Sequence, residues 1–233
     1  MALTVVQNKG VQGSSANGSS GAMGSTCVAG NLIVIAFGIR ISYTSVTIPT
    51  GFTLVTGIDG ASSNSVLFCW KISDGTETTF TFTHISSTWC IEVWEINESG
   101  GGTWVLDQQD SRAILSATTS GQCTTGITPT ASNSVAFVAD EQVNVNSGGE
   151  TVDSGFTARD TGAFDRMVCG EKIKTSNAAE NPTCAWVTAR TNQIIVCNFK
   201  ISGAPSAVPH SHGASVGISL PATVGTSYGS GEI

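Results

Sequence analysis

The chain is a succession of short runs of β-branched and aromatic residues separated by Gly, Asn, Asp and Ser. No stretch of about a dozen residues keeps the apolar stripe of an amphipathic helix, whereas strand-length runs bounded by turn residues recur along the whole sequence. We therefore expect strands near residues 3–7, 31–41, 52–58, 65–73, 77–83, 89–96, 103–108, 133–140, 151–158, 166–174, 183–189 and 193–201.

So many short strands with regular turn signals are typical of two packed antiparallel sheets. The sequence predicts an all-β fold, an antiparallel β-sandwich of jelly-roll-like type, formed by residues 1–201 as one domain. Residues 202–233 follow as an extended C-terminal arm.

The composition narrows the classes of partner. Only 12% of the residues are charged, against a usual share of about 25%, and 29 Ser, 29 Thr and 27 Gly residues take their place. The net charge of −7 argues against a nucleic-acid partner, because phosphate contacts require an excess of Lys and Arg.

No apolar run reaches the roughly 18 residues that span a bilayer, so no membrane partner is expected. The N-terminus lacks the basic and apolar regions of a secretory signal.

The cysteines point to a reducing compartment. There are seven, an odd number, and no two have the CxxC spacing of a zinc site. Most lie inside apolar runs, where a buried reduced thiol acts as a small apolar side chain. The residues concerned are Cys27, Cys69, Cys90, Cys123, Cys169, Cys184 and Cys197.

Three sequence blocks recur in the same order about 100 residues later, which indicates an approximate internal two-fold repeat. The predicted pseudo-repeats cover about 27–100 and 128–201, and each half is expected to supply strands to both sheets. The alternative is convergence, since short strands and turns draw on few residue types. The block pairs are 51–55 with 155–159, 67–72 with 167–173, and 92–96 with 197–201.

The C-terminal arm is rich in Gly, Ser and Pro, and Glu232 is its one charged residue. A solvated tail is usually more charged, so we expect the arm to lie on a neighbouring subunit, with a disordered tail as the alternative. The predicted contact residues are Val216, Ile218, Leu220, Val224 and Tyr228.

No residue pattern in the sequence predicts a catalytic site. Two Gly-x-Ser-x-Gly matches, at 213–217 and 225–229, lie in the arm without the strand, helix and later His of a nucleophile elbow. Glu92 and Glu95 are three residues apart in an expected strand, so they should point to opposite faces. Asp107 and Asp110 are interpreted as capping or turn residues. A polysaccharide-degrading sandwich enzyme is the weakest alternative, and we expect a protein that is not an enzyme.

No cofactor or metal ion is expected either. His210 and His212 would share one side of a strand, but no third ligand is near them in the sequence.

The tryptophans are candidates for sugar binding, because flat aromatic rings suit sugar faces. Trp89 shares one strand face with apolar neighbours and Trp94 shares the other, so both are expected in the core. Trp104 follows three glycines and is the best candidate for an exposed ring that contacts a glycan.

Five segments carry a resemblance to β-sandwich virion structural proteins of tailed bacteriophages: 29–36, 48–55, 67–71, 78–83 and 89–96. The resemblance covers roughly residues 3–201 and consists of strand and turn patterns. Its most distinctive part is the Pro-x-Gly-Phe turn of residues 49–52, which suits Pro at turn position i+1 and Gly at a positive φ.

The resemblance implies a non-enzymatic virion structural protein, above all a capsid decoration (cement) protein bound to the shell lattice. Its implied partners are the major capsid protein, other virion subunits and further copies of the chain. Its implied location is the virion, after assembly in the host cytoplasm. The alternative is a carbohydrate-binding tail or fibre domain that contacts a host surface glycan.

Overall fold

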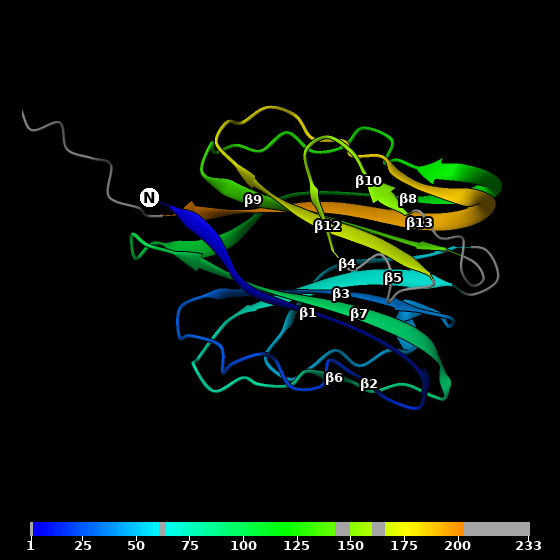
Figure 1. The fold of residues 1–233 in the computed structure, drawn as a ribbon, viewed down its shortest axis with the longest axis horizontal. Helices are drawn as coiled ribbons and strands as arrows, with labels where there is room; N and C mark the ends of the chain where they lie inside the picture. The colour runs from blue at the N-terminus through cyan, green and yellow to red at the C-terminus, as the bar shows by residue number, and fades with distance from the viewer. Residues whose placement is uncertain (1, 61–63, 143–149, 160–165, 203–233) are drawn as a thin grey trace, which may run out of the picture.

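The computed structural model describes residues 2–60, 64–142, 150–159 and 166–202. Two antiparallel sheets are stacked face to face (Figure 1), so the prediction of an all-β antiparallel sandwich is confirmed. The first sheet has strands β1 (Leu3–Ser15), β3 (Leu32–Ile39), β4 (Thr53–Asp59), β5 (Ser65–Ile72) and β7 (Ser87–Glu98). The second has β8 (Thr103–Gly121), β9 (Ser134–Gln142), β10 (Thr151–Val152), β11 (Thr157–Arg159), β12 (Met167–Lys174) and β13 (Cys184–Ser202).

Two small elements lie outside these sheets. The strands β2 (Gly18–Ser19) and β6 (Thr81–Phe82) form a two-stranded sheet of their own. A short 3-10 helix, η1 (Tyr43–Ser45), follows β3. In Figure 1, β2 and β6 lie below the first sheet, on the side away from the second.

The two sheets repeat one strand order. It is β1-β7-β3-β5-β4 in the first sheet, and β8-β13-β9-β12-β11 in the second once the pairing of β8 with β13 is included. Each half therefore builds its own sheet, and the expected exchange of strands between halves is wrong. Between the two large sheets, the chain crosses only once among the described strands, at the four residues 99–102. This connectivity differs from a jelly roll, and repeats that begin at 27 and 128 leave out β1 and β8.

Local contacts also recur about 100 residues later. The side chain of Gln7 on β1 brackets Ser25, donating to its carbonyl at 3.1 Å and accepting from its N–H at 3.0 Å. On β8, Asp110 accepts from the N–H of Thr125 at 3.1 Å. In both halves a polar side chain of the edge strand holds the loop that precedes the central strand.

The repeated Gly-Phe blocks form turns with glycine at positive φ. Gly51 has a φ of 83° and Gly155 a φ of 76°, a region that only glycine enters without strain. Phe52 donates its N–H to the carbonyl of Pro49 at 3.2 Å. Pro49 is therefore residue i of this turn, one position earlier than predicted.

Both faces of each sheet are covered. Between the sheets, the ring centroids of Trp94 and Phe137 are 5.1 Å apart, and those of Phe137 and Phe199 are 6.0 Å apart. On the outer face of the first sheet, Phe37 stacks on Phe82 at 4.1 Å. Every residue of β3 and of β9 is buried as a result. This burial on two faces explains why these strands are continuous apolar runs rather than alternating ones.

All seven cysteines are buried and free, which confirms that they serve as small core residues. Burial raises the pKa of Cys27 and of Cys123 to about 12, so these thiols stay protonated and unreactive at neutral pH.

We expect Phe137→Ala to lower the free energy of unfolding by about 3–5 kcal/mol, because it opens a cavity between the two sheets. Urea denaturation would measure the change. Leu115→Ala is the control, since Leu115 is 68% exposed and its truncation should cost less than about 0.5 kcal/mol. Equal effects of the two variants would contradict this location of the core.

Candidate functional site

Buried polar side chains gather at one end of the sandwich, where β3 and β9 end and β5 and β12 begin. We call this group the polar end cluster. Its members are at most 3% exposed, and they come from both sheets. Such a concentration of buried polar groups is unusual, because each one loses its hydration. The members are Asn64, Glu141, Gln142, Arg166 and Gln193.

Arg166 links the two sheets within the cluster. Its Nη2 lies 2.7 Å from Oε1 of Glu141 in the second sheet and donates to Oδ1 of Asn64, just before β5 of the first sheet. Its carbonyl accepts from the N–H of Gln142 at 2.8 Å. A buried charge needs such pairing to be tolerated, so Arg166 and Glu141 require each other.

Glycines make room for these side chains. A Cβ on Gly38 would lie 2.3 Å from Oε2 of Glu141, and one on Gly60 would lie 1.7 Å from Nε2 of Gln193. Neither glycine has a positive φ, so both serve close packing and not turn geometry. Sequence inspection missed this role, because the partners are more than 100 positions away along the chain.

Burial also changes the acid–base properties of the cluster. It raises the pKa of Glu141 to about 7, although Arg166 and the Cys90 thiol act in the opposite direction. Next to it, burial raises the pKa of Asp140 well above its ordinary value, against a side-chain hydrogen bond from Asn192. A carboxyl with a pKa near 7 suits proton transfer, but Glu141 has no exposed surface, so substrate cannot contact it in this conformation.

Several polar atoms of the cluster have no hydrogen-bond partner among the described residues: Nε and Nη1 of Arg166, Nε2 of Gln142 and both amide atoms of Gln193. Unsatisfied buried groups are few in folded proteins and often mark water or ligand positions. Chemically, the cluster can donate to and accept from a small polar molecule or water. It is therefore the candidate functional site of the described chain.

We expect Gly38→Ala to lower the free energy of unfolding by about 1–3 kcal/mol, because the added methyl overpacks Glu141 and Cys90. Thermal denaturation would measure this. Gly24→Ala is the matched control, since a Cβ at Gly24 approaches only Oε1 of Gln7, at 3.4 Å. An unchanged free energy of unfolding in Gly38→Ala would show that the cluster is loosely packed.

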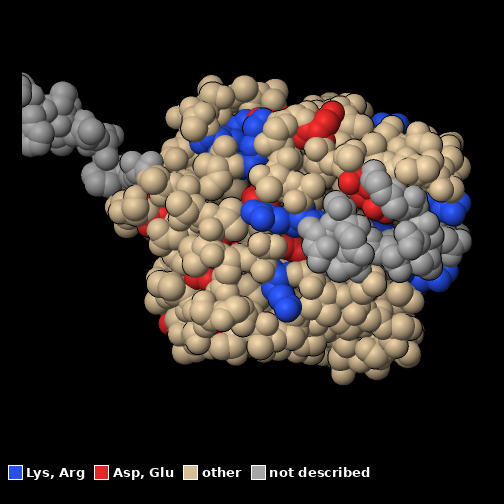
Figure 2. Space-filling model, viewed as in Figure 1, with Lys and Arg blue, Asp and Glu red and all other residues tan. Residues whose placement is uncertain are grey.

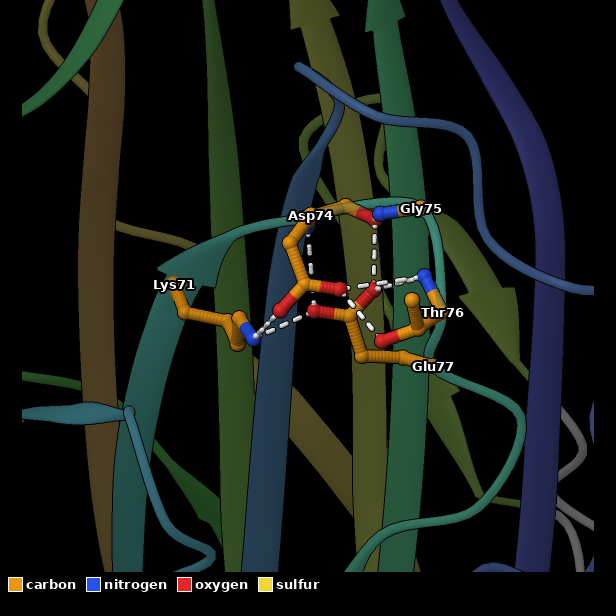
Figure 3. Close-up of polar contacts among 6 residues, drawn as sticks. Lys71, Asp74, Gly75, Thr76 and Glu77 are labelled. Carbon is orange, nitrogen blue, oxygen red and sulfur yellow. Dashed lines mark hydrogen bonds and ion pairs between the residues drawn. The ribbon is translucent and has the colours of Figure 1, made fainter.

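A second polar group lies in the loop after β5 (Figure 3). Lys71 contacts both Asp74, at 3.2 Å, and Glu77. Asp74 also accepts from the N–H of Thr76 at 3.1 Å. In Figure 3 the ammonium group of Lys71 points between the two carboxylates, so it offsets one of the two negative charges of this loop.

The same ion pair recurs in the second half, where Lys172 lies 2.9 Å from Glu180. The backbone hydrogen bonds of the two loops are also equivalent. Cys27 donates its N–H to the carbonyl of Glu77 at 2.9 Å, and Ile127 donates its N–H to the carbonyl of Glu180 at 2.8 Å. Because both halves keep this contact, we interpret it as part of the scaffold.

Burial alone would raise the pKa of Glu77, but hydrogen bonds from Lys71 and Ser73 lower it to about 2. A depressed carboxyl pKa adds stability above the ordinary value near 4.5, and this stability is lost as the pH falls toward 2. We expect Glu77→Gln to lower the free energy of unfolding by about 1–2 kcal/mol at pH 7.

The difference between Glu77→Gln and the wild type should close between about pH 4.5 and pH 2, as urea denaturation at several pH values would show. Asp74→Asn is the control at the same lysine. Its side chain is 60% exposed, so solvent screens its contact with the lysine and the change should cost clearly less than Glu77→Gln. A pH-independent deficit in Glu77→Gln would argue against the ion pair as its cause.

The structure places the predicted carboxylates as structural residues. Glu92 lies on the face of β7 that meets the second sheet and accepts from Asn8 at 2.8 Å. Glu95 lies on the other face and accepts from the N–H of Val28 at 2.7 Å, so the prediction of opposite faces is confirmed. Asp107 and Asp110 accept N–H groups of the loop before β9. They hold this loop from inside β8, so the strand end predicted near residue 108 is wrong.

The prediction that Trp104 is exposed is wrong. Its side chain is 2% exposed and belongs to the core between the sheets. The reason is the turn at residues 99–102, which starts the second sheet so that Trp104 pairs with Ile201 and alternation turns its ring inward. The alternation of Trp104 with the inward Leu106 is the signal that would have revealed this. Trp89 and Trp94 are buried as expected, at 6% and 0% exposed.

The predicted arm residues Val216, Ile218, Leu220, Val224 and Tyr228 lie outside the described residues, as do His210 and His212. Among the described residues no group of three His, Cys, Asp or Glu side chains could hold a metal ion. In the same part of the chain, no helix has the length and apolar character needed to cross a membrane.

Comparison of the chain with protein-family models, with curated proteins and with solved structures finds no match.

Proposed function

We propose that this chain is a structural subunit of a virus particle, a decoration protein that binds a shell lattice and performs no catalysis. The observation that carries the proposal is where the scarce charge lies. At least six of the ten Lys and Arg residues form ion pairs with described residues of the fold. The surface that remains is rich in Ser and Thr and can form hydrogen bonds without a large cost of desolvating charges.

One face of the molecule illustrates this distribution. In Figure 2 most of the described surface belongs to uncharged residues, and the charged residues gather in small groups. A sparsely charged polar surface can pack against many copies of a partner with few charges to desolvate, whereas most soluble proteins keep an evenly charged surface. This favours a subunit that works in a dense assembly.

A rigid scaffold fits the same role. The sheets are covered on both faces and pinned by equivalent contacts in each half, so the shape of the subunit should change little on assembly. The resemblance to tailed-phage sandwich proteins supports this class, and the sparsely charged arm would add a second point of attachment with a gain in avidity.

The test is to locate the chain in particles made from the genome that encodes it, by cryo-electron microscopy of wild-type particles and of particles that lack it. We expect density of the sandwich at repeated positions on the shell that disappears when the chain is absent. Density in the tail would reassign the subunit to a tail or fibre. Absence of the chain from purified particles would refute the proposal.

We expect deletion of residues 203–233 to leave the melting temperature of the sandwich nearly unchanged but to weaken its attachment to particles by tenfold or more. Co-sedimentation of the purified variant with particles that lack the protein would measure attachment. Unchanged attachment would rule out a role for the arm.

A further inference from the structure

An apolar groove lies on the outer face of the first sheet, the face that points away from the second sheet. Its volume is about 310 Å³, at the small end of the range for ligand pockets, which suits a few side chains better than a large ligand. None of the described residues that line it is charged. The lining residues are Tyr43, Thr44, Val46, Ile48, Leu54 and Leu67.

The groove is held in shape by its own contacts. Asp59 accepts from the hydroxyl of Ser42 at 2.6 Å and from the N–H of Tyr43 at 2.9 Å, which anchors η1 to β4. The ring of Tyr43 lies against Gly57, where a Cβ would come within 2.3 Å of it. A preformed groove loses little conformational entropy when it binds a partner.

One wall of this groove is poorly covered. Leu54 is 43% exposed, among the few large apolar side chains with that much exposure, while Leu67 at the floor is 1% exposed. The groove thus offers an apolar floor and an open apolar wall to whatever binds it.

The chain itself contains a segment of matching chemistry. In the sequence of the arm, Val216, Ile218 and Leu220 alternate with Gly217 and Ser219. In an extended chain, alternate side chains point to one side, so this segment would present three branched aliphatic groups together. Neither segment nor groove carries a charge, so their contact would bury no ion.

The arrangement of the two sheets favours binding of the groove by the arm of a neighbouring copy over binding by the arm of the same chain. Ser202 ends β13 in the second sheet, paired with Thr103. Asn31 and Gly102 line one cavity, so the end of β13, which pairs with Thr103, lies near the start of β3. Tyr43 of the groove follows the opposite end of β3. An arm from the same chain would have to pass around the sandwich and along the length of β3, while a neighbour's arm can approach the outer face directly.

We propose that the segment Val216–Leu220 of one copy binds the groove of Tyr43, Val46, Ile48 and Leu54 on a second copy and so links subunits of this protein. The inference rests on the proposed role of the arm in assembly, and it specifies the partner and the contact surface.

The test uses the full-length protein, whose molar mass is measured by sedimentation equilibrium over a range of concentrations. We expect the wild type to self-associate and both Leu54→Asp and Leu220→Asp to weaken association at least tenfold. Leu115→Asp is the matched control, because Leu115 is 68% exposed on β8, away from the groove, and it should associate like the wild type. A synthetic peptide of residues 213–224 should dissociate wild-type oligomers.

The outcomes separate this inference from the proposed function. A monomeric wild type, or oligomers that persist in Leu54→Asp with an unchanged melting temperature, would overturn the groove as the binding site. Equal weakening by Leu115→Asp would overturn it as well. In each case the attachment of full-length and truncated protein to particles still tests the structural role independently.

Discussion

The aromatic core between the two sheets is the interaction on which the rest of this structure depends. Trp94 from the first sheet meets Phe137 and Phe199 from the second, and each half of the chain can cover the inner face of its sheet only by packing on the other half. A single five-stranded sheet with two apolar faces would expose too much apolar surface to be stable alone. The covered outer faces then follow, since the central strands β3 and β9 are apolar on both sides.

The polar end cluster is the main departure from this apolar plan. Arg166 and Glu141 stay buried because each neutralises the other, and Asn64 ties the pair to the opposite sheet. The glycines that face Glu141 and Gln193 show that space is set aside for these side chains. Such a cluster adds little stability compared with apolar packing, but it can specify how the two sheets register. Its unpartnered donors and acceptors make it the place where the described chain could hold a small polar molecule.

The charged residues of the described chain serve the fold of the subunit more than its surface. The ion pairs at Lys71 and Lys172 fasten loops within the subunit and use two of the ten basic residues there. A sparsely charged exterior, an apolar groove and an arm with a single charged residue together fit a subunit that binds other subunits through polar and apolar contacts. This combination links the low charge of the sequence to the proposed role more closely than composition alone allows.

Local features could be predicted from the amino-acid sequence: strands where apolar runs end in turn residues, opposite faces for Glu92 and Glu95, and buried thiols. Each of these depends on residues within a few positions of one another. Three features depend on the three-dimensional fold: each half forms its own sheet, Trp104 is buried beside Ile201, and Glu141, Arg166 and Asn64 meet at one end. Those outcomes depend on contacts between residues that are up to 102 positions apart, and strand periodicity gives the face of a side chain but not the strand that covers it.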